Sequence, residues 1–67
     1  MRPSEVAERA LLGALLLEPA RQSEVEAWLE PSDFYAYRHA LVYSTTQRLH
    51  DEGVEPTARA VLDRILP

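Results

Sequence analysis

The feature that most constrains this chain is residues 10–17, ALLGALLL, a run of apolar residues and one glycine in a protein of 67 residues. The run is far too short to span a bilayer, so protein must cover its leucines. A fold of this size hides only about 60% of the surface that its unfolded chain exposes. There is no cysteine to form a disulfide. Stability must therefore come from helix packing or from association with a partner.

Helical periodicity and proline or glycine breaks divide the sequence into four segments. Ser4 and Thr57 are expected to cap the first and last helices. The second helix has two possible starts, at Pro19 or at a Ser23–Glu26 capping box, and Pro31 closes it. The third is expected over residues 36–51, with Gly53 after its end. No strand-like alternation occurs. The sequence predicts an all-α, compact four-helix bundle with orthogonal packing, as one domain over residues 1–67.

On a helical wheel, most apolar residues of the first helix share one broad half: Val6, Ala7, Ala10, Leu11, Ala14, Leu15 and Leu17. Leu12 and Leu16 fall on the side of Glu8 and Arg9, so we expect both to be exposed. A helix that is apolar on all sides must be covered by another chain when its own domain is too small to surround it. We therefore expect a homodimer or higher homo-oligomer through this helix, with Leu12, Leu16, Leu11 and Leu15 as interface residues. The end of the third helix and the fourth helix form an alternative dimer surface.

Gly13 costs this helix roughly 1 kcal/mol relative to alanine. Together with Ala10 and Ala14 it makes a strip of small residues, which lets another helix approach closely and offsets that cost. A tolerated weak spot or a local kink is the alternative.

The remaining apolar residues predict a core between the helices. Trp28 is interpreted as a core or edge anchor, with a recognition role as the alternative. His39 has no catalytic partner at a recognisable spacing, so we expect a packed histidine that donates to a backbone carbonyl. The expected core residues are Phe34, Tyr35, His39, Val42, Tyr43 and Leu49.

Charge and missing motifs exclude several functions. The net charge is −4 and none of the seven basic residues is a lysine, so direct nucleic-acid binding is not expected. A small helical nucleic-acid-binding module, with Arg38 and Arg48 on the third helix, is kept as the rival hypothesis. No P-loop or catalytic motif is present, and His39 and His50 are too far apart for a helical metal pair. We expect no enzyme activity, cofactor or metal, no membrane association, and, since no signal peptide is recognisable, a cytoplasmic location.

An ordered set of residues resembles the N-terminal domain of DnaB-like replicative DNA helicases. The matching stretches are Glu8 to Leu17 (ERALLGALLL), Asp33-Phe34-Tyr35, His39, Val42-Tyr43, Leu49 and Gly53. The spacing agrees without gaps from Glu8 to about Gly53. After that the family commonly has Pro-Ile-Asp, whereas this chain has Val54-Glu55-Pro56-Thr57.

The resemblance implies an all-α, non-catalytic module that joins helicase subunits into a collar and gives primase, or a helicase loader, a surface to dock on. In the family this head continues into a helical hairpin and then an ATPase motor domain. The 67 residues correspond to the head alone.

Overall fold

The structure is a computed structural model, and it describes residues 4–66. Residues 1–3 and 67, which belong to the expected 1–67 domain, lie outside the described part. Within residues 4–66 the chain forms four α-helices and no strand, which confirms the all-α prediction. Their bounds are α1 Glu5–Leu17, α2 Gln22–Glu26, α3 Tyr37–Asp51 and α4 Ala58–Ile65, with 3₁₀ turns at Pro19–Arg21 and Pro31–Asp33.

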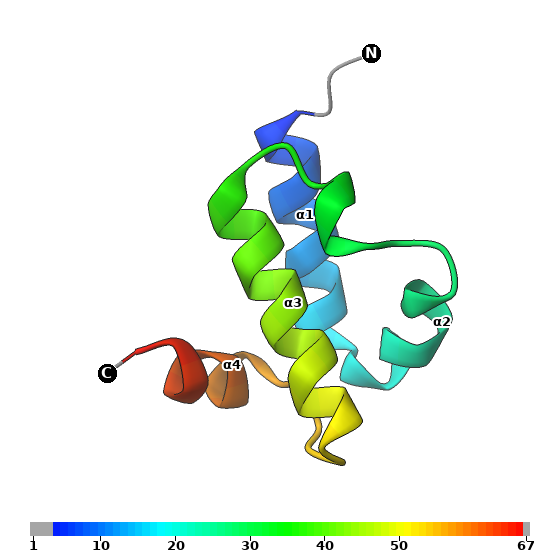
Figure 1. The fold of residues 1–67 in the computed structure, drawn as a ribbon, viewed down its shortest axis with the longest axis vertical. Helices are drawn as coiled ribbons and strands as arrows, with labels where there is room; N and C mark the ends of the chain where they lie inside the picture. The colour runs from blue at the N-terminus through cyan, green and yellow to red at the C-terminus, as the bar shows by residue number, and fades with distance from the viewer. Residues whose placement is uncertain (1–3, 67) are drawn as a thin grey trace.

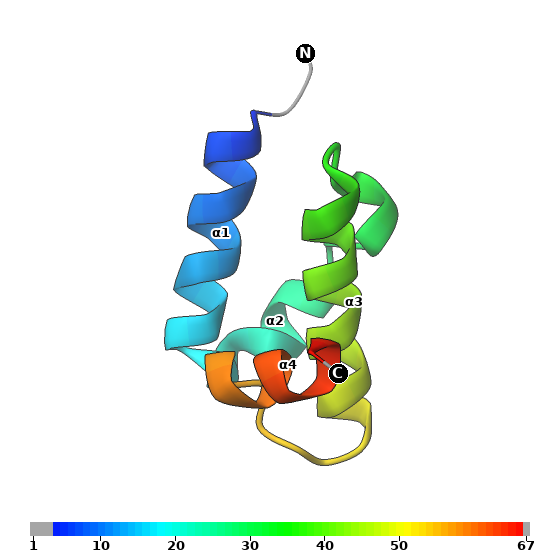
Figure 2. The same cartoon turned by 90° about the vertical axis from the view of Figure 1, so that its left-hand side faces the viewer.

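The two long helices, α1 and α3, lie side by side and run in the same direction (Figure 1). The short α2 and the two 3₁₀ turns make the connection that returns the chain from the end of α1 to the start of α3. Figure 2 shows α4 lying across the end of this pair, crosswise to both helices. Because α2 is so short, it covers only part of the side of α1 that it faces.

Helix ends follow the predicted local signals. The Ser4 hydroxyl accepts hydrogen bonds from the backbone N–H groups of Val6 and Ala7, and the Thr57 hydroxyl accepts one from Ala60 at 3.1 Å. Gly53 ends α3 with a φ of 80°, in the left-handed region that glycine adopts without a steric penalty. Both predicted N-caps and the end of α3 are thus confirmed.

The start of α2 does not follow the predicted capping box. α2 begins at Gln22, and Ser23 lies inside it rather than at its cap. The Ser23 hydroxyl is instead 3.0 Å from His50 Nε2 on α3. Neither expected start is therefore used, since Pro19 opens a separate 3₁₀ turn and α2 itself begins three residues later. The helix also ends earlier than predicted, at Glu26 rather than at Pro31.

Tyr43 is at the centre of the hydrophobic core and is completely buried. Its hydroxyl donates a 2.8 Å hydrogen bond to the backbone carbonyl of Leu29, which fixes the segment after α2 against α3. Its ring packs at a tilt on Phe34, with ring centroids 5.3 Å apart. The buried cluster consists of Leu12, Leu15, Val25, Leu29, Phe34 and Tyr43. Of the expected core residues, Phe34, Tyr43 and Leu49 are buried and Val42 is partly buried.

The orientation of α1 corrects the helical-wheel prediction. Leu12 is only 5% exposed and Leu15 is buried beside it, whereas Leu17 is 85% exposed. The prediction that Leu12 is exposed is therefore wrong, and Leu12 and Leu15 cannot offer an interface while this fold is intact. Leu11 and Leu16 are partly buried.

The reason for this orientation is Glu8, which the wheel had placed on the solvent side. The Glu8 carboxylate is buried and accepts hydrogen bonds from the backbone N–H groups of Tyr35, at 2.6 Å, and Ala36, at 3.2 Å. These N–H groups precede the first turn of α3, which has no capping side chain of its own. Glu8 therefore caps α3 from another helix, and the face of α1 that carries Glu8, Leu12 and Leu15 is turned inward.

Two further core predictions need correction. His39 is buried as expected, but its Nδ1 lies 2.9 Å from Glu8 Oε1 rather than from a backbone carbonyl. Burial alone raises the pKa of Glu8, but the hydrogen bonds from Tyr35, His39 and Ala36 outweigh it and leave that pKa below its ordinary value. Tyr35 contributes its backbone to this site, while its side chain is exposed rather than part of the core.

Candidate protein-binding surfaces

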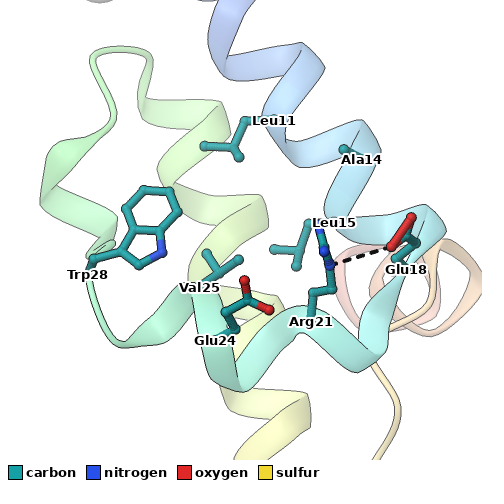
Figure 3. Close-up of a pocket in the computed structure, with 8 residues that line it drawn as sticks. All are labelled: Leu11, Ala14, Leu15, Glu18, Arg21, Glu24, Val25 and Trp28. Atoms are coloured by element: carbon teal, nitrogen blue, oxygen red, sulfur yellow. Dashed lines mark ion pairs between the residues drawn. The ribbon is translucent and has the colours of Figure 1, made fainter.

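A groove lies between α1 and α2 on the described part of the chain. It has a volume of about 180 Å³. Figure 3 shows Leu11, Leu15 and Val25 gathered between Trp28 on one side and the Glu18–Arg21 ion pair on the other. Ala14 and Glu24 complete the lining. Most of the lining is therefore apolar, with charged side chains from α2 and its approach.

Trp28 gives the groove its largest apolar surface. It lies in the turn after α2 and is 61% exposed. Val25 and Leu29, its neighbours in the apolar pattern, are buried in the core. Trp28 is therefore at the edge of the core rather than within it. Exposed tryptophans of this kind are enriched among the residues that carry binding energy at interfaces.

A second hollow of about 210 Å³ adjoins the groove, because Leu11 lines both. The other residues of this hollow are Ala7, Glu8, Leu29, Asp33 and Phe34. Along α1 the two hollows are lined by residues 7, 11, 14 and 18, which follow one another at helical spacing on one side of the helix. The groove and its extension together form a furrow parallel to α1.

The outer face of α1 is a second apolar surface. Val6 and Leu17 are its large residues, and both are strongly exposed. Ala10 and Gly13 lie between them and are exposed too. Apart from Gly13 itself, its two chain neighbours and the nearby backbone of α1, no described atom lies within 4 Å of where a Cβ on Gly13 would be. The small-residue strip predicted at Ala10, Gly13 and Ala14 is therefore not packed against another helix of residues 4–66, and close packing there remains a prediction about a partner.

The side of α4 that carries Leu62 and Leu66 is a third apolar surface. Val61 faces the core, but Leu62 is 51% exposed and Leu66 is also exposed. The apolar residues at the end of the chain are therefore only partly covered by the described residues. They form the surface to which the alternative dimer hypothesis applies.

Four of the six arginines within residues 4–66 are in ion pairs with acidic side chains. Arg64 is 2.8 Å from Glu52, and Arg38, on the proposed recognition helix of the rival hypothesis, contacts Glu5. Arg21 pairs with Glu18 and Arg59 with Asp63. Ion pairing reduces the positive potential that a phosphate backbone requires. This arrangement disfavours a nucleic-acid interface.

The described residues offer little to a cofactor or metal ion. No group of three or more His, Asp or Glu side chains within residues 4–66 is placed to hold a metal. Glu8 and His39 form a buried pair, and the Glu8 carboxylate already accepts hydrogen bonds from the backbone N–H groups just before α3. None of the helices in the described part is long and apolar enough to cross a membrane.

The predicted interface at Leu12 and Leu15 is wrong for this fold, because both side chains are buried in the core. The strongly exposed apolar residues of α1 are Val6 and Leu17, and Leu11 lines the groove beside α2. Trp28 had been interpreted mainly as an anchor.

Comparison with known proteins identifies the family. The model of the DnaB-like helicase N-terminal domain matches residues 2–66, essentially the whole chain, and no match to the motor domain of these helicases accompanies it. Searches of curated proteins and of solved structures give no match. Since one family model covers nearly every residue, this chain belongs to the DnaB-like helicase N-terminal domain family.

Proposed function

We propose that this chain is a non-catalytic oligomerisation and docking module of a replicative helicase. It associates with a second copy through the outer face of α1, and it provides a separate surface for a replisome partner such as primase. The family, which is associated with hexamer formation, supports this proposal. The observation that carries it is the exposed outer face of α1, from Val6 to Leu17.

The chemistry of that face suits a contact between two helices. Val6, Ala10, Gly13 and Leu17 form one apolar stripe along three turns of α1. The small residues in its middle allow a second helix axis to come close, and the larger residues at its ends supply apolar area. A face of this kind pairs naturally with its own copy about a two-fold axis, where the same residues meet from both sides.

Sedimentation of wild type and two charge variants tests self-association. Leu17→Glu places a carboxylate on the outer face of α1, and Leu62→Glu places one on the exposed surface of α4. We expect the mass of wild type to rise with concentration, Leu17→Glu to remain monomeric, and Leu62→Glu to behave like wild type. Circular dichroism confirms that both variants are folded.

The outcomes separate the surfaces. A wild type that is strictly monomeric at high micromolar concentration refutes self-association. A dimer abolished by Leu62→Glu but not by Leu17→Glu assigns the contact to α4 and refutes the role of α1. Tight, salt-sensitive binding of duplex or single-stranded DNA would instead favour the rival nucleic-acid-binding module.

A further inference from the structure

We infer that the furrow between α1 and α2 binds a basic amphipathic helix of a partner protein, with Trp28 as the central apolar contact and Glu24 facing the partner's cations. This inference rests on the proposed function, because it takes the chain to be a docking module, and it names the site and the chemistry of the docked partner. It concerns a surface different from the outer face of α1.

The shape of the furrow favours a helix as the occupant. The α1 residues that line it run from Ala7 to Glu18. This separation corresponds to about 16 Å, or three turns of a helix. No strand, and therefore no sheet edge, is present in residues 4–66 to hydrogen-bond an extended peptide. A helix makes its backbone hydrogen bonds internally and can place one apolar stripe in such a furrow.

The apolar side chains that line the furrow are the ones that the apolar stripe of the partner helix would contact. Leu11 is shared by both hollows and is only partly buried, and Trp28 is the large exposed side chain beside it. Burying an aromatic side chain of this size contributes a substantial part of the binding energy of small interfaces. Leucine-sized side chains of the partner would fill the space next to Trp28.

Charge specifies the polar side of the partner. Residues 18–33, which form the α2 side of the molecule, contain five acidic residues and one basic residue. Their net charge equals the −4 of the whole chain, since the other six acidic and six basic residues cancel. Arg21 is paired with Glu18, so the basic member of the rim is partly neutralised. A partner rich in lysine or arginine is attracted to this side and an acidic one is repelled.

A labelled-peptide binding experiment tests this inference. The probe is a short fluorescein-labelled helix with leucine on one face and lysine on the other, and its matched control has glutamate in place of every lysine. Fluorescence anisotropy measures the affinity of each for the folded chain at low and high salt. We expect the lysine peptide to bind roughly tenfold or more tightly than the glutamate peptide, with an affinity that falls as salt rises.

Matched variants locate the bound peptide. Trp28→Ala is compared with Tyr37→Ala, which removes another exposed aromatic side chain outside the furrow. Glu24→Lys is compared with Glu55→Lys, which makes the same charge change in the exposed loop before α4. We expect Trp28→Ala and Glu24→Lys each to weaken binding several-fold or more, and the two control variants to bind like wild type.

Leu17→Glu separates this inference from the proposed self-association. We expect it to bind the lysine peptide like wild type, whatever its oligomeric state. Loss of binding in Leu17→Glu but not in Trp28→Ala overturns the inference, because the peptide then occupies the outer face of α1. Equal binding of the two peptides overturns the basic partner, and wild-type affinity in both Trp28→Ala and Glu24→Lys overturns the furrow as the site. A monomeric wild type that still binds the lysine peptide through Trp28 refutes self-association alone.

Discussion

Replacing Leu12 by alanine tests the orientation of α1 directly, because Leu12 is buried in the structure and the sequence pattern predicts it to be exposed. Leu12 lies in the cluster around Tyr43. Leucine-to-alanine changes at such sites cost about 2–5 kcal/mol. A chain of 67 residues is expected to have a free energy of unfolding of only roughly 3–10 kcal/mol. The variant should therefore lose a large part of its stability, and its Tm should fall by about 10 °C or more.

The matched control is Leu17→Ala, the same change on a residue of α1 that is strongly exposed. Its free energy of unfolding should stay within about 0.5 kcal/mol of wild type. Urea and thermal unfolding followed by circular dichroism measure both variants. The measurement is made at two protein concentrations, because a dimer held through Leu17 would add stability that depends on concentration. Equal losses for both variants, or a larger loss for Leu17→Ala at low concentration, refute the described orientation of α1.

Three further predictions concern single groups. Because the fold lowers the pKa of Glu8, its ionised carboxylate stabilises the fold at pH values above the ordinary pKa of 4.5, and this contribution is lost as the pH falls through the lower pKa of the folded state. Glu8→Gln should therefore reduce the free energy of unfolding, measured in urea, at neutral pH and have a smaller effect in acid. Tyr43→Phe leaves the Leu29 carbonyl without its 2.8 Å donor and should cost about 1–2 kcal/mol in the same assay, whereas no loss would contradict that bond. Gly13→Ala should raise the Tm through about 0.5–1 kcal/mol of helix propensity, while Gly53→Ala should lower it by a similar free energy because of its positive φ.

Features encoded by neighbouring residues could be predicted from the sequence. Ser4 and Thr57 cap their helices through N–H groups two or three residues away. Gly53 ends α3 because of its own backbone preference. The four helices and the all-α class follow from such local signals together with apolar spacing. These are interactions whose partners lie within one turn in the sequence.

The rotation of α1 could not be predicted because its cause is not local. Glu8 is turned inward by N–H groups of residues 27 and 28 positions later in the chain. A helical wheel treats a glutamate as a solvent residue and so assigns the opposite face to the core. Once Glu8 was misplaced, Leu12 was assigned to the surface.

The furrow could not be predicted for a similar reason. Its existence depends on how far α2 extends along α1, and a helix of only five residues leaves Trp28 beyond its end. Val25, Trp28 and Leu29 follow one another at helical spacing in the sequence, which places them on one face. The sequence did not indicate which of the three would lack a covering element.

The capping of α3 by a carboxylate from α1 has a consequence for cooperativity. The N–H groups that lead into α3, those of Tyr35 and Ala36, have their Glu8 acceptor only when the two helices are docked. Secondary and tertiary structure should therefore be lost together, in a single all-or-none transition. A fragment that begins after α1 should fray at the start of α3, even though every residue of that helix is still present.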